Sequence, residues 1–182
     1  MSQGNHEDEF LKRYGTDFTA RLAASLGCAR GGFSGAVDFR LHVVPGKKAP
    51  DPSDHYPTLT YRVLYHHGAW GGQNKGYPAA KRFAFAHDGW DAFVYGHNHA
   101  SVVHPEVRVT PNGRTGRMDE RTVHIIDCAS FVRSYSDDPE ITHYGERKGY
   151  DRQPRTAPLI RVTVVEGGRQ PDRYALRKSV EV

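Results

Sequence analysis

Alternating apolar and polar residues predict β-structure over most of this chain. Between Val37 and Val43, apolar residues occupy every second position, with Asp38 and Arg40 between them. This period of two is typical of a half-buried strand. Six further apolar or alternating runs predict strands over residues 59–65, 92–94, 102–109, 122–126, 159–165 and 174–180.

Two segments have the period of a helix instead. In the first, apolar residues stand four positions apart and form a stripe of Phe10, Tyr14, Phe18, Leu22 and Leu26. This stripe predicts a helix that faces a core and stops near Gly27. In the second segment, Pro78 fits the first turn of a helix whose apolar face consists of Ala79, Phe83, Ala86 and Trp90.

The order of the elements is helix, strand, strand, helix, strand and then mostly strands. This order favours an α/β or α+β sandwich. A length of 182 residues suits a single domain over residues 1–182 and is short for two domains. Turns are expected at Pro111-Asn112-Gly113 and Gly167-Gly168, and a loop in the proline-rich residues 45–57.

Composition narrows the class of protein. The mean hydropathy is -0.68, no apolar stretch approaches the roughly 18 residues of a membrane span, and the first residues have no apolar signal segment. Cys28 and Cys128 lie far apart and are expected to be buried thiols in a reducing compartment. We therefore expect a cytoplasmic protein without a membrane partner. The net charge of +4 suits an anionic substrate, but no dense basic stripe supports a nucleic-acid partner.

Candidate chemistry lies where predicted strands end in glycine and histidine. His97 and His99 follow Gly96 at the end of the apolar run of residues 92–94. Residues two apart in an extended backbone point to the same side, so these two imidazoles can face one spot. The pattern therefore indicates a metal site.

Two other segments resemble this one in composition. His66-His67-Gly68 ends the strand predicted over residues 59–65, and Gly4-Asn5-His6-Glu7 precedes the first helix. Imidazole nitrogens and a carboxamide oxygen together suit a borderline divalent cation such as Mn, Fe, Zn or Ni. His67, next to the glycine, is favoured over His66 as a ligand. Asn5 also suits the cap of a helix.

The glycine-rich residues 68–76 form a second candidate element of the site. Backbone N–H groups of such a loop can cradle a phosphate, and the loop carries Trp70 and Lys75. We therefore take His66, Trp70 and Lys75 as candidate substrate-binding residues. A plain connecting loop is the alternative reading.

The chain resembles the calcineurin-like metallophosphoesterases, including phage and prophage members. The family pattern runs Asp-x-His, Gly-Asp-x-x-Asp, Gly-Asn-His-Asp/Glu, a His often followed by Gly or Pro, and Gly-His-x-His. The last three blocks are present in order as Gly4-Asn5-His6-Glu7, His67-Gly68 and Gly96-His97-Asn98-His99. The resemblance covers nearly the whole chain and implies a four-layer αββα fold with a pair of divalent metal ions.

The resemblance also implies a role for each matching residue. Asn5, His67 and His97 would ligate the second metal ion, and His99 the first. His6 would be the catalytic acid that protonates the leaving group, since an imidazole titrates near neutral pH. The reaction would be hydrolysis of a phosphomonoester or phosphodiester by the two-metal scheme.

The chain departs from the family pattern because neither Asp-x-His nor Gly-Asp-x-x-Asp occurs in it. Those blocks supply the remaining ligands of the first ion and the carboxylate that bridges both ions. Relative to the family the domain is therefore N-terminally truncated, and its fold should be incomplete, with an unpaired strand edge and an uncovered apolar face. We expect this chain alone to bind one metal ion or none.

Three functional hypotheses follow from these observations. The first is the C-terminal part of a metal-dependent phosphoesterase, a partial enzyme as it stands. The second is an inactive remnant, an interaction module, or half of a two-chain enzyme whose partner carries the missing blocks. The third is a basic nucleic-acid-binding fragment, which would need more interleaving of aromatic and basic residues than the sequence has.

Overall fold

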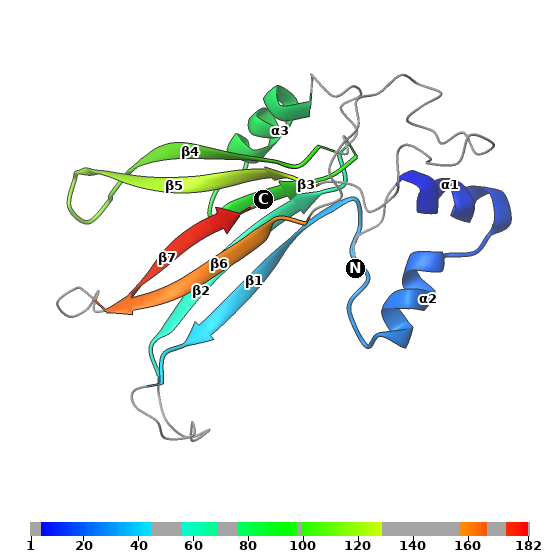
Figure 1. Ribbon diagram of the computed structural model, residues 1–182, viewed down its shortest axis with the longest axis horizontal. Coiled ribbons are helices and arrows are strands. Elements are labelled where there is room, and N and C mark those ends of the chain that lie inside the picture. The colour runs from blue at the N-terminus through cyan, green and yellow to red at the C-terminus, as the bar shows by residue number, and fades with distance from the viewer. Residues whose placement is uncertain are drawn as a thin grey trace.

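The protein is described by a computed structural model over residues 5–44, 56–68, 76–97, 100–128, 157–166 and 174–181, with the backbone alone at Asn5, His6 and Tyr174. All the strands expected from alternation are present (Figure 1). In chain order the elements are α1 Asn5–Tyr14, α2 Phe18–Ser25, β1 Ser34–His42, β2 Thr58–His66, α3 Gly76–Phe85, β3 Ala92–Tyr95, β4 Val102–Pro111, β5 Met118–Asp127, β6 Leu159–Glu166 and β7 Tyr174–Glu181.

Five of the strands form one mixed sheet in the order β1-β2-β3-β5-β4. The three central strands β2, β3 and β5 run parallel, while β1 and β4 pair antiparallel at the two edges. Strands β6 and β7 form a separate antiparallel hairpin. The expected α/β class is therefore confirmed as a mixed α/β architecture, with the helix α3 connecting the parallel strands β2 and β3.

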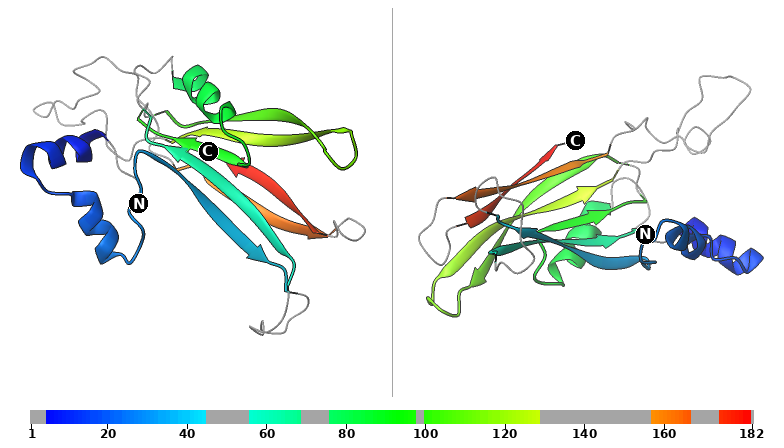
Figure 2. Two further views of the ribbon diagram at one scale, coloured as in Figure 1. Left: turned by 180° about the vertical axis from the view of Figure 1, so that it is seen from behind. Right: turned by 90° about the horizontal axis from the view of Figure 1, so that it is seen from below.

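The two sheets and α3 form layers (Figures 1 and 2). On one face of the five-stranded sheet, Tyr61, Val63, Ala92 and Ile126 are buried against the β6–β7 hairpin, which contributes Ile160, Val162, Leu176 and Val180. Successive residues of a strand point to opposite faces, so the neighbouring residues of β3 and β5 point to α3. The sheet is thus covered on both faces at its centre.

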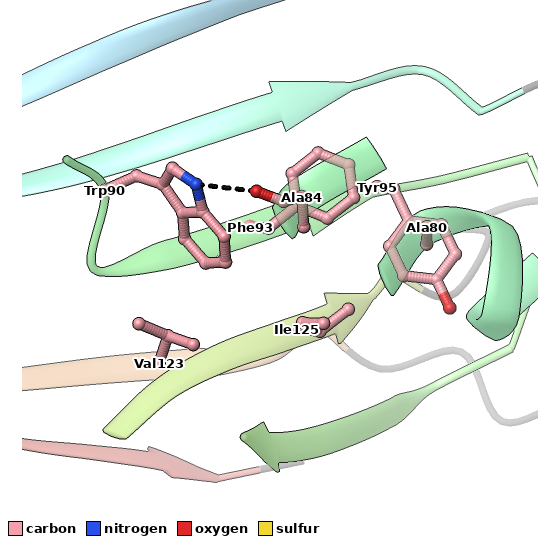
Figure 3. Close-up of a cluster of buried hydrophobic side chains, with 7 residues drawn as sticks. All are labelled: Ala80, Ala84, Trp90, Phe93, Tyr95, Val123 and Ile125. Carbon is pink, nitrogen blue, oxygen red and sulfur yellow. Dashed lines mark hydrogen bonds between the residues drawn. The ribbon is translucent and has the colours of Figure 1, made fainter. Parts of the chain in front are cut away.

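The face toward α3 holds the larger apolar cluster (Figure 3). Its fully buried members are Ala80, Ala84, Trp90, Phe93, Tyr95, Val123 and Ile125. The small side chains of Ala80 and Ala84 let the helix approach the rings of Phe93 and Tyr95. The indole Nε1–H of Trp90 donates to the carbonyl oxygen of Ala84 at 2.9 Å, which satisfies its one polar atom inside the cluster.

The helical segment around Pro78 is confirmed, but its predicted apolar face is partly wrong. The helix ends at Phe85, so Ala86 and Trp90 are outside it, and Ala86 is exposed. The buried helical residues are Gly76, Ala80 and Ala84. Ala80 and Ala84 each lie one residue beyond the expected Ala79 and Phe83. Trp90 instead reaches the core from the loop before β3, where no helical period applies.

The predicted N-terminal helix is interrupted, and its apolar stripe does not face a core. Gly15, with φ of 64°, ends α1, and the Asp17 carboxylate accepts from the Ala20 N–H at 2.8 Å to cap α2. The stripe residues Phe10, Tyr14, Phe18, Leu22 and Leu26 are all exposed, and the buried residues of α2 are Thr19 and Ala23. The expected stop at Gly27, with φ of 63°, is confirmed.

The β6–β7 hairpin leaves both flanks of the five-stranded sheet uncovered. Val37 and Phe39 on β1 are exposed, as are Val107 and Val109 on β4. These residues lie on the same face as Leu41 and Val103, which pack against the hairpin cluster. Among the described residues, apolar side chains at both flanks of this sheet face are thus left uncovered by the hairpin. The expected truncation of the family fold stays a prediction.

Two further expectations concern the cysteines and membranes. Both cysteines are free thiols, and Cys128 is half-buried, whereas Cys28 is exposed, so the expectation of a buried thiol is wrong at Cys28. Cys28 follows the end of α2, where the helix leaves its side chain outside any apolar cluster. Within the described ranges, no helix has the length and apolarity needed to cross a membrane.

A polar clamp fixes α3 to the edge strand β4. The carboxylate of Glu106 accepts from the hydroxyl of Tyr77 and from Lys81 Nζ, the latter at 2.7 Å. The bonds from Lys81 and then Tyr77 lower the pKa of Glu106 below its ordinary value. The imidazole of His104 stacks on the ring of Tyr77 at a centroid distance of 3.8 Å.

Glu106→Gln should destabilise the protein at neutral pH but much less in acid. A carboxylate whose pKa is lowered by folding adds stability above its unfolded-state pKa, about 4.3, and this contribution is lost as the pH falls through the folded-state value. Urea unfolding of both proteins at neutral pH and near pH 3 measures the difference. Glu120→Gln, at an exposed position on β5, is the matched control. A Glu106→Gln difference that stays constant with pH would contradict the assignment.

Candidate metal site at the carboxyl ends of the parallel strands

The carboxyl ends of the three parallel strands meet at one edge of the sheet. Backbone pairing aligns His66 of β2 with Tyr95 of β3, and Tyr95 with Asp127 of β5. The chain continues from these ends into His67-Gly68, Gly96-His97 and Cys128. Ligand sites of open α/β sheets commonly lie at this edge. Helices α1 and α2 lie beyond the same end of the sheet (Figures 1 and 2).

His67 and His97 come together at this edge. Their ring centroids are 5.3 Å apart and their planes make an angle of 72°. The backbone N–H of His67 donates to the carbonyl oxygen of Phe33 at 2.7 Å, and the Phe33 ring meets the His67 ring edge-on. Two histidines that the sequence predicts as ligands of one ion are therefore neighbours, although they are 30 positions apart in the chain.

The backbone at His97 is unusual. His97 has a φ of 76°, and no other described residue except glycines has a positive φ. This left-handed conformation costs a residue with a side chain about 1–3 kcal/mol in general. Backbone strain of this kind is commonly retained at binding sites, because the surrounding structure holds the side chain in a required direction.

Gly68 explains how the two loops approach each other so closely. Its φ is 88°, and a Cβ atom there would lie 2.4 Å from the carbonyl oxygen of Gly96 and 3.1 Å from Cβ of His97. A Cβ at Gly96 would lie 3.4 Å from the carbonyl oxygen of His67. The two glycines thus allow backbone-to-backbone contact directly beside the two imidazoles.

His66 points in another direction from His67. Its Nδ1 accepts from the N–H of Gly68 at 2.8 Å, and its ring lies 4.8 Å from that of Phe83 on α3. Burial lowers the pKa of His66, which favours the neutral imidazole needed for this acceptor role. This contact stabilises the turn at Gly68. The choice of His67 over His66 as the metal ligand stays a prediction. The proposed contact of His66 with substrate stays a prediction.

Tyr95 and Asp127 end β3 and β5 at this edge of the sheet and were not predicted as part of the site. Both are buried, at 1% and 4% exposure. Burial, and then the charge and hydrogen bonding of Asp127, raise the pKa of Tyr95. Burial and the same carboxylate raise the pKa of Cys128 to about 11, so its thiol stays protonated near neutral pH. The sequence signal that could have identified Asp127 is its position, because it ends an apolar run just as His66 and Tyr95 do.

Several predicted site residues lie outside the described part of the structure. These are His99, Trp70 and Lys75, together with the side chains of Asn5 and His6. The backbone of Asn5 and His6 forms the first residues of α1. Their assigned roles therefore stay predictions.

The separation of the two imidazole rings can be compared with that of two ligands of one divalent cation. A ring that ligates a cation at about 2.1 Å has its centroid about 3.2 Å from the ion, so two rings about 110° apart have centroids about 5 Å apart. The observed 5.3 Å agrees with this arrangement. Within the described ranges, no group of three or more His, Cys, Asp or Glu side chains is placed to hold an ion. The described residues thus include two neighbouring candidate ligands, and the metal site stays a prediction.

Comparisons of the chain with models of protein families, with curated proteins and with solved structures found no match.

Proposed function

We propose that this chain is the C-terminal part of a metal-dependent phosphoesterase of the calcineurin-like class. The observation that supports it best is the pairing of His67 with His97 at the carboxyl ends of β2 and β3. Both residues belong to sequence blocks that resemble the family, and both follow parallel strands, as ligands in such a site would. The substrate class is a phosphomonoester or phosphodiester, and the compartment that suits the two free thiols is the cytoplasm.

In this proposal each residue has a defined role. His67 and His97 present neutral imidazole nitrogens to one divalent ion, and Asn5 adds a carboxamide oxygen. His99 belongs to the other ion, and His6 donates a proton to the leaving oxygen. When bound, the two ions offset charge on the phosphoryl group and lower the pKa of the attacking water. His66 holds Gly68, so that the His67 loop keeps its place beside Gly96.

The chain by itself provides too few ligands for two ions. Asn5, His67 and His97 can hold one ion, whereas His99 alone cannot hold another, and no carboxylate in the family pattern bridges the pair. Two nearby dications without a bridging negative charge repel each other strongly. We therefore propose that the chain alone binds a single ion weakly and does not hydrolyse phosphate esters efficiently.

Titration calorimetry with Mn²⁺ and Zn²⁺ tests the site. Wild-type protein should bind one ion, and His67→Ala and His97→Ala should each weaken binding about tenfold or more, since loss of outer-shell partners alone costs 10–100-fold. His42→Ala is the matched control, because His42 is exposed on β1 and its Nδ1 contacts Thr58 Oγ1 at 2.9 Å. Turnover of bis(4-nitrophenyl) phosphate should be negligible.

Each result has a clear consequence. Equal metal affinity of wild type, His67→Ala and His97→Ala would contradict the proposal that these two histidines bind a metal ion. Two tightly bound ions with rapid phosphodiester turnover would agree with the proposed metal site but would contradict the proposal that the chain is only a partial enzyme.

The uncovered surfaces favour a second candidate, in which a separate polypeptide completes the domain. The β6–β7 hairpin covers only the middle of its sheet face, and the stripe on α1 and α2 is exposed. A partner bearing Asp-x-His and Gly-Asp-x-x-Asp would supply the missing ligands and cover these surfaces. The coding DNA upstream of Met1 and the neighbouring genes distinguish such a two-chain enzyme from a remnant or an interaction module. For a remnant or an interaction module, neither Asp-x-His nor Gly-Asp-x-x-Asp should be encoded in frame upstream or in a neighbouring gene.

A further inference from the structure

Strand β1 presents a free hydrogen-bonding edge. It is the first strand in the sheet order, and no described strand pairs with its outer side. Residues 36–42 contain neither proline nor glycine. Edge strands in monomeric proteins are commonly protected by proline, lysine, a bulge or a covering element, because an exposed regular edge pairs with other strands. The outer edge of β1 lacks proline, lysine and a covering described element.

The two faces of β1 differ in chemistry. Val37 and Phe39 lie on the same face as Leu41, and they are 44% and 53% exposed. Asp38 and Arg40 lie on the opposite face. Asp38 forms an ion pair with Arg62 of β2 at 2.6 Å, while Arg40 forms none with the described residues. A strand that pairs with β1 should therefore place apolar residues beside Phe39 and a carboxylate opposite Arg40.

A second copy of β1 meets both requirements in one register. Directly opposed residues in an antiparallel pair point to the same face. A two-fold axis perpendicular to the sheet runs midway between the two strands. Neighbouring residues point to opposite faces and so cannot oppose each other. The axis must therefore lie between the two copies of one residue, and below it is named by that residue.

The charges on β1 select among these registers. An axis through Asp38 places two carboxylates opposite each other, and an axis through Arg40 places two guanidinium groups opposite each other. Like charges in this position destabilise a sheet. An axis through Val37 leaves Phe39 opposite Gly35, which has no side chain to cover it.

An axis through Phe39 instead satisfies every pair. It places Asp38 of each copy opposite Arg40 of the other, Phe39 opposite Phe39, and Val37 opposite Leu41. We propose that two copies of this chain associate through antiparallel pairing of residues 36–42 about Phe39, forming one continuous sheet across a two-fold axis. Such a self-complementary contact is the usual form of a homodimer interface. This interface does not involve the residues of the candidate metal site.

Charge reversal on β1 tests the proposal in the full chain. Sedimentation velocity should show a concentration-dependent dimer, and Arg40→Asp should raise the dimer dissociation constant about tenfold or more, because it turns two opposite-charge pairs into like-charge pairs. The double variant Asp38→Arg with Arg40→Asp restores opposite charges and should recover the dimer. Arg177→Asp, an equal charge change at an exposed position on β7, is the matched control, with thermal unfolding followed by circular dichroism as a check on folding.

A cross-link tests the register directly. In a Cys28→Ser background, Phe39→Cys should form an intermolecular disulfide under mild oxidation, because opposed residues in antiparallel strands have Cα atoms about 4.5–5.5 Å apart. Val107→Cys, exposed on the other edge strand β4, should not. A monomer at every concentration, a dimer insensitive to Arg40→Asp, or a dimer linked through Val107→Cys instead of Phe39→Cys would each overturn the proposal.

Discussion

Gly68→Ala is expected to destabilise the protein and to abolish the metal affinity of the candidate site. The added Cβ would lie 2.4 Å from the carbonyl oxygen of Gly96, and backbone atoms cannot move aside as the end of a side chain can. The left-handed φ of 88° adds its own cost, about 1 kcal/mol for alanine. We expect a total loss of about 3 kcal/mol or more in the free energy of unfolding. Urea denaturation and metal titration measure the two effects.

The variant Gly116→Ala serves as a control, because it has the cost of a left-handed φ without the steric clash expected for Gly68→Ala. Gly116 also has a left-handed φ, of 68°, but a Cβ there would meet no atom within 4 Å. This variant should lose only the cost of the φ angle, about 1 kcal/mol, and should keep the metal affinity. If both variants lose the same stability and neither loses metal affinity, the contact between Gly68 and Gly96 does not position the two histidines.

The strands were predictable because their signal is local. Alternation over residues 37–43 and the apolar run before Gly96 depend on a few consecutive residues, and β1 and β3 form there. The pairing of His67 with His97 was also accessible, since parallel strands place their carboxyl ends together. Local patterns do not specify the order of the strands in the sheet. That order places Asp127 at the same edge as His66 and Tyr95.

The N-terminal helices show the limit of a periodic pattern. A stripe from Phe10 to Leu26 fits one helix, yet the chain turns at Gly15, and Asp17 starts a new helix. The spacing continues across the break because the intervening residues happen to keep the period of four. The pattern also gives no partner for the stripe. Three of its rings contact one another, with the Phe10 centroid 4.7 Å from that of Tyr14 and 6.4 Å from that of Phe18. Burial depends on what lies opposite, which periodicity cannot specify.

Asp91→Ala should destabilise the protein by about 3–5 kcal/mol, because it leaves a mostly buried ammonium group without its counter-charge. Asp91 precedes β3, and its Oδ1 accepts from Lys178 Nζ of β7 at 2.5 Å. Its Oδ2 accepts from the backbone N–H of Arg62 on β2 at 2.9 Å. The Asp91 and Lys178 side chains are only 15% and 18% exposed. One carboxylate therefore joins the β6–β7 hairpin to the five-stranded sheet, and urea denaturation measures its contribution.

The distinction between a buried and an exposed ion pair provides the control. Glu181→Ala removes the carboxylate that contacts Arg161 on the same hairpin at 3.2 Å, where both side chains are more than half exposed, and it should cost less than about 1 kcal/mol. Replacing Lys178 with methionine in the Asp91→Ala background removes the stranded charge and should recover part of the lost stability. Equal losses for Asp91→Ala and Glu181→Ala would mean that apolar packing of Ile160, Val162, Leu176 and Val180 alone holds the hairpin in place. In that case the Asp91–Lys178 ion pair would contribute no more to stability than an exposed pair does.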